Sequence, residues 1–309
     1  MASVYNDLNR PPLNEHSLQR ALMVPGGFVS ALRVLPEVES TNTALLAAAA
    51  QGAPHGSVVV AEMQTAGRGR LGRSWVAAPR SGLFLSILVR PQVPVARRGW
   101  LPLLAGVAAR SAVARVADLE VSLKWPNDLI INPNDHQNAD APDSSDDPSG
   151  AGPVDAEPVS GYGLGRKLGG ILAEQGGSNG DTYIVVGIGI NVTLSEDELP
   201  AAHATSLALA GATVTDRDTL LRVLLRTFGS WYADWTASDG DAERSGLAAA
   251  YRAACATLDR PVRAELPGGV SVSGHATDLD ADGRLLVRTA DGGETPIGAG
   301  DVVHLRSAQ

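Results

Sequence analysis

The chemistry that this sequence suggests most directly is the binding of anions, and it centres on a segment that mixes arginine with glycine. Residues 61–75 read AEMQTAGRGRLGRSW and interleave Arg68, Arg70 and Arg73 with Gly67, Gly69 and Gly72. Glycine lets the backbone come close to a ligand, and the guanidinium fork matches pairs of phosphate oxygens. The pattern indicates a polyphosphate-binding loop. A solvated turn or a contact to single-stranded RNA would use the same residues.

A second group of polar residues surrounds a proline. The segment LKWPNDLII places Lys124 and Trp125 at the end of one strand-like stretch, with Asn127 and Asp128 before the next. An aspartate near phosphates is a common oxygen ligand for Mg²⁺. The alternative is structural, because Asn and Asp also build Asx-turns.

Two further segments combine glycine with apolar residues. In GRKLGGILAE, Lys167 is either a fixed positive charge in a pocket or an ordinary lysine at a strand edge. The segment IVVGIGINV contains Gly187 and Gly189 in a G-x-G pattern, but Val192 stands at the third glycine position of a dinucleotide-binding fingerprint. No acidic residue follows at the required distance either, so that function is rejected. The glycines instead predict close approach of a ligand or of a neighbouring strand.

Composition excludes several classes of protein. The chain has 309 residues, a formal net charge of −9 and a pI of about 5.1, so general nucleic-acid binding is not expected. Cys255 is the single cysteine, which excludes an intrachain disulfide and fits a reducing compartment. Neither a signal peptide nor a run of about 18 apolar residues is evident, so we expect a cytoplasmic protein without a membrane span.

These motifs need a scaffold of both strands and helices. Ser40 precedes TNTALLAAAA and is predicted to cap a helix. Apolar spacing predicts a buried helix over residues 101–116, helical structure within residues 216–255 and a short helix at residues 18–23. Short apolar or β-branched runs predict strands at residues 58–61, 83–89, 129–131, 171–173 and 183–190.

The chain divides into regions of different texture. We expect an N-terminal extension over residues 1–30, a central domain over residues 31–257 and a small domain over residues 258–309. Residues 132–160 are rich in Asp, Pro, Ser and Gly and are expected to form a disordered insertion. In the last region, short strand-like runs alternate with the turns LPGG, DADG and ADGG. They predict a β-barrel that docks on the larger domain, because roughly 50 residues bury too little surface alone.

The motifs STN, QTAGRGRLGR, KWPND, KLGGILAE and GIGIN, in this order and before a β-rich C-terminus, closely resemble bacterial biotin–protein ligases. The resemblance runs from about Ser40 to the end of the chain. It implies an α/β (α+β) fold: a catalytic domain with a mixed, largely antiparallel sheet, related to class II aminoacyl-tRNA synthetases, and an SH3-like β-barrel. The insertion and the N-terminus depart from the family pattern. The sequence before Ser40 is too short for a winged helix-turn-helix, so the chain resembles the ligase-only class without a DNA-binding domain.

The resemblance also implies roles for individual residues. Ser40 and Trp75 have competing structural roles, as a helix cap and as a core side chain. The implied biotin contacts are Ser40, Thr41, Asn42, Gln64, Arg68, Gly69, Arg70, Trp75, Lys167 and Gly170. The implied ATP contacts are Arg70, Arg73, Trp75, Asn127, Lys167 and Asn191. Lys167, Arg70 and Arg73 are the implied catalytic residues, and Asp128 is the implied Mg²⁺ ligand.

The implied reaction is ATP-dependent formation of biotinyl-5′-AMP, followed by transfer of biotin to a lysine of the biotin carboxyl carrier domain of an acyl-CoA carboxylase. Mg²⁺ is the implied cofactor. We expect a monomer or weak homodimer that binds neither DNA nor membranes. One alternative is a lipoate or octanoate ligase of the same fold, for which a different Arg-Gly signature with a histidine is expected. A nucleic-acid-binding module built on GRGRLGR and a non-catalytic β-barrel protein are further alternatives.

Overall fold

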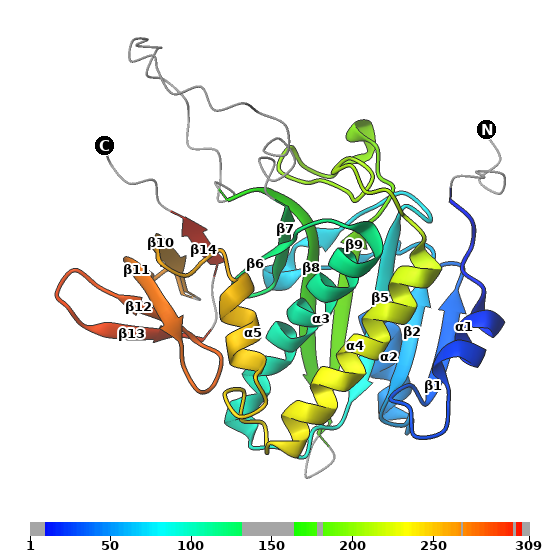
Figure 1. Ribbon diagram of the computed structural model, residues 1–309, viewed down its shortest axis with the longest axis horizontal. Coiled ribbons are helices and arrows are strands. Elements are labelled where there is room, and N and C mark those ends of the chain that lie inside the picture. The colour runs from blue at the N-terminus through cyan, green and yellow to red at the C-terminus, as the bar shows by residue number, and fades with distance from the viewer. Residues whose placement is uncertain (1–9, 132–163, 178–181, 267, 299–300, 305–309) are drawn as a thin grey trace.

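A seven-stranded sheet forms the centre of the protein, in the order β1-β2-β5-β9-β8-β7-β6 (Figure 1). The computed structural model describes residues 10–131, 164–177, 182–266, 268–298 and 301–304, so the predicted insertion at residues 132–160 lies outside the described residues. The strands are β1 (Ala31–Leu35), β2 (Ser57–Ala61), β5 (Gly82–Val89), β6 (Ser122–Lys124), β7 (Asp128–Ile131), β8 (Arg166–Gly176) and β9 (Tyr183–Asn191). Only β1 and β2 pair in parallel within this sheet, which confirms the prediction of a largely antiparallel sheet.

Helices cover the two faces of the sheet unequally. They are α1 (Glu15–Leu22), α2 (Thr41–Ala50), α3 (Trp100–Ala117), α4 (Arg217–Ala237) and α5 (Leu247–Ala254). On β5, Leu85 and Ile87 join the large core that contains α3, α4 and α5, which lie in front of the sheet in Figure 1. Leu88 points the other way and joins a small cluster with Leu45 of α2. Because successive side chains of a strand alternate between faces, Ser86 also points toward α2.

Strand β8 is longer than the predicted strand at residues 171–173. Gly169 and Gly170 weaken the local preference for a strand. Both residues nevertheless pair with β7 on one side and β9 on the other. Pairing on both edges therefore overrides the local sequence preference, as is usual for a strand inside a sheet. The prediction of helical structure within residues 216–255 is confirmed. The region forms two helices, α4 and α5, rather than one.

Helix α3 is the most apolar of the three helices α3, α4 and α5. The stretch Val95–Ala117, which contains it, is long and apolar enough to span a membrane by length and composition. However, 67% of its most apolar window is buried inside the protein. Leu101, Leu104, Ala108 and Val113, the stripe predicted from the sequence, are all completely buried. The apolar character of α3 is thus explained by its place in the core.

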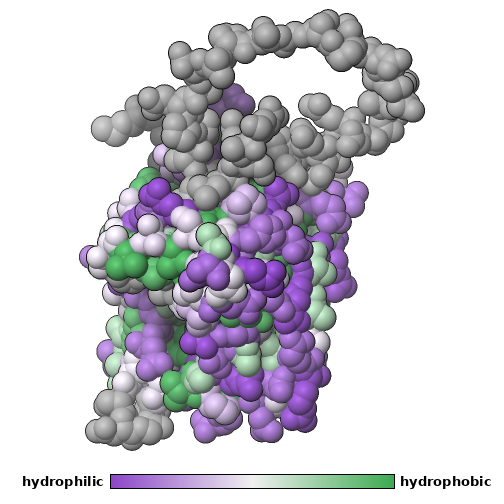
Figure 2. Space-filling view, turned by 90° about the vertical axis from the view of Figure 1, so that its left-hand side faces the viewer, coloured by the Kyte–Doolittle hydropathy of each residue, from purple (hydrophilic) through white to green (hydrophobic). Residues whose placement is uncertain are grey.

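The C-terminal region forms a five-stranded antiparallel sheet, in the order β13-β12-β11-β10-β14. Its strands are β10 (Arg260–Glu265), β11 (Ser271–Leu279), β12 (Leu285–Arg288), β13 (Glu294–Ile297) and β14 (Asp301–His304). The turn between β11 and β12 contacts the central region, because Ala281 O accepts from Trp100 Nε1 at 3.0 Å and Gly283 O accepts from Trp125 Nε1 at 3.1 Å. These bonds confirm the predicted docking. Seen from this end, the surface is mainly hydrophilic with separate hydrophobic patches (Figure 2).

Candidate active site

The Arg-Gly segment folds back on itself as a short hairpin. Strand β3 (Gly67–Arg68) pairs with β4 (Ser74–Trp75), and Gly69 N donates to Arg73 O at 2.7 Å. A side chain on Gly67 would clash with this pairing, because its Cβ would lie 2.5 Å from Trp75 O. We call residues 67–75 the Arg-Gly loop. Gly67 thus lets the two short strands of the loop pair closely.

The Arg70 side chain connects this loop to Asn127 of the KWPND segment, which lies 57 residues further along the chain. One guanidinium NH1 donates to Asn127 Oδ1 at 3.2 Å, and Asn127 Nδ2 donates to Ile171 O at 3.1 Å. Burial, the largest cause, lowers the pKa of the Arg70 guanidinium, while Asp128 raises it and Arg73 lowers it. Arg70 stays charged at neutral pH, since an arginine starts from such a high pKa. It is therefore a partly desolvated cation at the site.

Lys167 and Asp128 form the central ion pair of the site. They lie on the neighbouring strands β8 and β7, and Lys167 Nζ is 2.6 Å from Asp128 Oδ1. The Lys167 ammonium also lies 5.7 Å from the centroid of the Trp75 ring, within the range of a cation–π contact. Arg70 and Lys167 come from separate segments of the chain and converge here, since both interact with Asp128.

Lys124 is a site residue that the sequence analysis mentioned without a role. It is 8% exposed, and it and Lys167 are the only lysines in the sequence. Burial is the largest cause that lowers the pKa of Lys124 to about 8; Asp128 opposes this shift, and Lys167 and Arg73 add to it. Three cationic side chains, those of Arg70, Lys124 and Lys167, thus interact with one carboxylate, and Arg73 lies near them. The signal in the sequence was the scarcity of lysine itself.

The residues expected at the biotin head form a second, connected group. Ser40 caps α2 by accepting from Thr43 N, so its structural role is confirmed. Thr41 N donates to Gln64 Oε1 at 2.8 Å, and Asn42 is held by Ser86 and by further bonds described below. Ser86 was not predicted, although a lone serine within the apolar run GLFLSILV was a usable signal.

Glycines of β8 and β9 lie between the cations around Asp128 and the polar residues at the start of α2, and other side chains pack on them. The Trp75 indole packs directly on Gly170 and Gly189, where an added Cβ would lie 3.1 Å and 3.0 Å from ring atoms. On Gly187, an added Cβ would lie 2.3 Å from Asn42 Oδ1. Gly187 and Gly189 are thus approached closely, as predicted, but by the side chains of Asn42 and Trp75 rather than by a neighbouring strand. Among the residues that the structure describes, the buried Trp75 Nε1 has no hydrogen-bond partner.

The Asn191 side chain is hydrogen-bonded to the loop of residues 203–205, which runs beside Lys167. Asn191 Nδ2 donates to Thr205 O at 2.9 Å, and Thr205 N in turn donates to Lys167 O at 2.8 Å. His203, in the same loop, accepts from Lys167 N through its carbonyl at 2.7 Å. Burial, followed by the charge of Lys167, lowers the pKa of the His203 imidazole and favours its neutral form. Asn191 therefore holds the loop that borders the cationic group.

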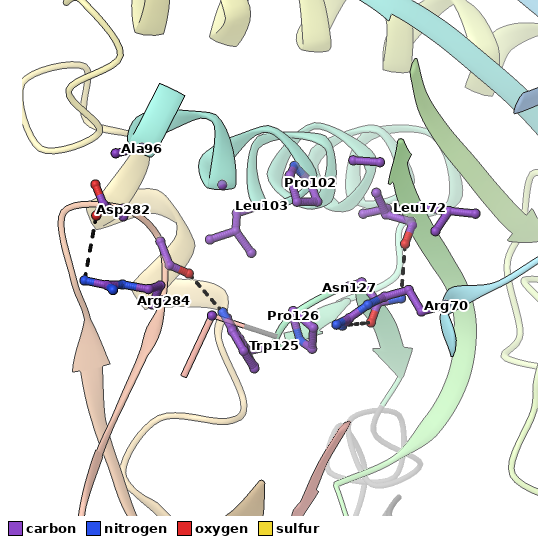
Figure 3. Close-up of a pocket in the computed structure, with 15 residues that line it drawn as sticks. Arg70, Ala96, Pro102, Leu103, Trp125, Pro126, Asn127, Leu172, Asp282 and Arg284 are labelled. Atoms are coloured by element: carbon purple, nitrogen blue, oxygen red, sulfur yellow. Dashed lines mark hydrogen bonds and ion pairs between the residues drawn. The ribbon is translucent and has the colours of Figure 1, made fainter. Parts of the chain in front are cut away.

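A cavity of about 440 Å³ opens beside Arg70 and Asn127. Its opposite wall comes from the C-terminal sheet, through Asp282 and Arg284, and Pro102 of α3 closes one side (Figure 3). The cavity thus joins the cationic group to the docked C-terminal sheet.

The donor set around Asp128 limits how a metal ion could bind. Within the described part of the chain, no group of three His, Cys, Asp or Glu side chains could hold a metal ion. Mg²⁺ often binds through one or two carboxylates and completes its shell with water and substrate phosphates. Asp128 fits that mode, and a cage made of protein ligands alone does not.

Comparisons with known proteins show which family the chain resembles. Residues 34–191 match the Biotin/lipoate A/B protein ligase family, and residues 257–305 match the Biotin protein ligase C terminal domain. A Mycobacterium tuberculosis protein named Biotin--[acetyl-CoA-carboxylase] ligase is 40% identical over 306 residues, which cover 97% of this chain and 98% of that protein. The Bacillus subtilis Bifunctional ligase/repressor BirA is 30% identical, covering 82% of this chain and 68% of its own length.

Solved structures show the same fold. The Aquifex aeolicus biotin protein ligase in complex with biotin and ATP has a TM-score of 0.64 at 25% identity, covering 90% of this chain and 99% of that chain. The Leishmania major biotin protein ligase in complex with biotinyl-5-AMP has a TM-score of 0.53 at 25% identity, covering 90% of this chain and 99% of that chain. From its sequence, its fold and the convergence of its motifs, the chain belongs to the biotin protein ligase family.

Proposed function

We propose that this protein is an ATP-dependent biotin–protein ligase, which makes biotinyl-5′-AMP and transfers biotin to a lysine of a biotin carboxyl carrier domain. The observation that carries the proposal is the group of cations around Asp128, contributed by separate segments of an acidic chain. Such a group lets two anions approach each other in a partly buried site, where charges interact more strongly than in water.

The first step joins two negatively charged groups. The biotin carboxylate attacks the α-phosphate of ATP, and pyrophosphate leaves. Lys167 and Arg70 reduce the repulsion between the anions and stabilise the charge that builds up on the phosphate oxygens. Lys167 Nζ lies 2.6 Å from Asp128 Oδ1, so a phosphate that contacts the ammonium would share it with this carboxylate. Arg73, in the same loop, contributes a further positive charge.

Asp128 is the residue that would hold Mg²⁺, together with phosphate oxygens. The ion would supply additional neutralisation of the leaving pyrophosphate. Asn127, which is bonded to Arg70, would orient the nucleotide beside it, and Asn191 would support the site through the loop of His203.

The biotin head is assigned to the group at the start of α2. Thr41, Asn42 and Gln64 supply its polar contacts, with Ser40 shaping the turn. The Trp75 indole packs on Gly170, and we assign the two residues to the wall and the floor of the biotin site. Arg68 and Gly69 belong to the loop that shields the reactive mixed anhydride from water.

In the second step, the amine of the carrier lysine attacks the biotinyl carbonyl, and AMP leaves. No enzyme nucleophile is needed. We assign the acceptor to the carrier domain of an acyl-CoA carboxylase, and we expect a cytoplasmic enzyme that works as a monomer or weak homodimer. It should bind neither membranes nor DNA. Light scattering during gel filtration tests the oligomeric state, and retention on a DNA column at physiological salt tests for DNA binding.

The decisive experiment is incubation with ATP, Mg²⁺, biotin and a carrier domain, followed by intact-mass measurement. The carrier should gain the mass of one biotinyl group, and this gain should disappear when the acceptor lysine of the carrier is replaced by arginine. Lipoate, offered in place of biotin, should support little ATP–pyrophosphate exchange. Exchange with lipoate but not with biotin would reassign the enzyme to the lipoate ligases.

A further inference from the structure

Glu174 lies between Asn42, which is proposed to contact the biotin head, and Arg68 of the Arg-Gly loop. Its Oε2 atom accepts hydrogen bonds from Asn42 Nδ2 at 2.7 Å and from Arg68 NH2 at 2.8 Å. Asn42 belongs to α2, Arg68 to β3 and Glu174 to β8. One carboxylate oxygen therefore connects three segments that are distant in the sequence.

The carboxylate determines which way the Asn42 amide points. An ionised carboxylate only accepts hydrogen bonds, so the amide must turn Nδ2 toward Glu174, and this atom also donates to Leu172 O at 3.1 Å. The amide oxygen Oδ1 then faces the Ser86 hydroxyl at 2.6 Å. Ser86 Oγ also lies 2.8 Å from Thr41 Oγ1, so the orientation set by Glu174 extends to Thr41.

The surroundings leave the Asn42 amide little freedom to choose another orientation. Asn42 is 3% exposed and packs directly on the backbone of β9 at Gly187. Without Glu174, the amide would keep only Leu172 O as its acceptor and would turn more easily. A change of this kind alters which atoms the site offers to a ligand, because the two ends of a carboxamide have opposite hydrogen-bonding character.

The second partner, Arg68, is largely outside the core. Its side chain is 44% exposed, against 24% for Glu174. Exposed ion pairs contribute little to the stability of a fold. The bond does, however, tie the Arg-Gly loop to β8. Its loss should therefore change the position of the loop more than the stability of the protein.

We propose that Glu174 is a positioning residue for biotin, an inference that rests on the proposed function. It holds the Asn42 carboxamide in the orientation that meets the biotin head, and through Arg68 it keeps the Arg-Gly loop against β8. Glu174 itself stays outside the reaction, since both of its hydrogen bonds are to protein side chains.

The test compares Glu174→Ala and Glu174→Gln with wild type in biotin-dependent ATP–pyrophosphate exchange. Glu174→Ala should raise the KM for biotin about ten- to a hundredfold, because it removes an acceptor shared by two donors. The KM for ATP and the kcat at saturating biotin should change less than about threefold. Glu174→Gln keeps an acceptor oxygen and should recover much of the biotin affinity. Glu120→Ala, which removes a carboxylate paired with Arg110 away from the site, is the matched control.

Limited trypsin digestion supplies a second measurement. Without ligands, Glu174→Ala should be cut faster than wild type after Arg68, Arg70 or Arg73, while Glu120→Ala should not. A wild-type KM for biotin in Glu174→Ala would overturn the inference, and so would an equal loss for biotin and ATP. If wild type shows no biotin-dependent exchange, the proposed function fails instead, so the two failures are distinguishable.

Discussion

At the scale of single residues, the site depends on how two lysines are placed. Lys124 and Lys167 are the only lysines of the chain, and both lie beside Asp128. Lysine carries a compact charge on a flexible stem and shifts its pKa readily when it is buried. Of the cations at the site, Lys124 is the one whose pKa burial lowers to about 8.

Replacing Lys167 with Ala should slow adenylation strongly. A preorganised charge that acts in the transition state contributes about 3–4 kcal/mol, which corresponds to roughly a hundred- to thousandfold in rate. ATP–pyrophosphate exchange with biotin measures this step alone. Arg110→Ala, a change on the outer part of α3, is the control and should leave the rate unchanged. Exchange near the wild-type rate in Lys167→Ala would show that the residue is wrongly assigned.

Replacing Lys124 with Met should stabilise the protein at neutral pH. The pKa of Lys124 is lowered from 10.5 to about 8, so the folded protein binds this proton less tightly than the unfolded chain. Below pH 8 the buried charge is fully present and costs up to about 3 kcal/mol. As the pH rises from about 8 to 10.5, that cost disappears. Urea unfolding at pH 7 and pH 10 should therefore show the variant's advantage shrinking, and a constant difference would contradict the cause given.

At the scale of elements, β8 and β9 provide a floor of glycines on which functional side chains rest. The glycines were recognised in the sequence as points of close approach, and the structure identifies Trp75 and Asn42 as what approaches. The partners were not predictable, because they come from the Arg-Gly loop and from α2. A local pattern of glycines predicts that another group approaches closely at that position. It does not predict which distant side chain that group belongs to.

Gly187→Ala should damage biotin binding. The new methyl group would lie 2.3 Å from Asn42 Oδ1, so the amide must move away from Ser86. We expect the KM for biotin to rise at least tenfold, with a loss of about 1–3 kcal/mol in unfolding free energy from overpacking. Exchange kinetics and urea unfolding measure the two effects. Gly106→Ala in α3 is the control, because the atom nearest to its added Cβ belongs to Leu123 of β6, at an ordinary 3.4 Å. An unchanged KM in Gly187→Ala would mean that Asn42 does not contact biotin.

At the scale of the whole molecule, the C-terminal sheet completes the cavity beside the cationic group. Two indole N–H groups hold its β11–β12 turn against the central region. Asp282 and Arg284 of that turn face the same cavity as Arg70 (Figure 3). Side chains of both regions of the protein thus line one cavity.

The scarcity of lysine has a consequence for self-labelling. An acyl-adenylate reacts with free lysine amines, but Lys124 is buried and Lys167 is paired with Asp128. Incubation with ATP, Mg²⁺ and biotin without a carrier should therefore add no biotinyl group to either lysine, as peptide mapping can verify. Arg284→Lys, at the cavity, should become labelled. Arg110→Lys is the control, and equal labelling of both variants would indicate that free adenylate in solution is the reagent.

The sequence by itself determined the family, the fold class and the groups that carry charge. Periodicity reports which face of an element is buried, and the Arg-Gly, KWPND and KLGG segments name their chemistry through residue type. The tertiary structure decided which groups meet. Only the pairing of β7 with β8 brings Lys167 to Asp128, and only the packing of α2 on β5 makes Ser86 a partner of Asn42. Such contacts join residues far apart in the chain, where spacing in the sequence carries no information about distance.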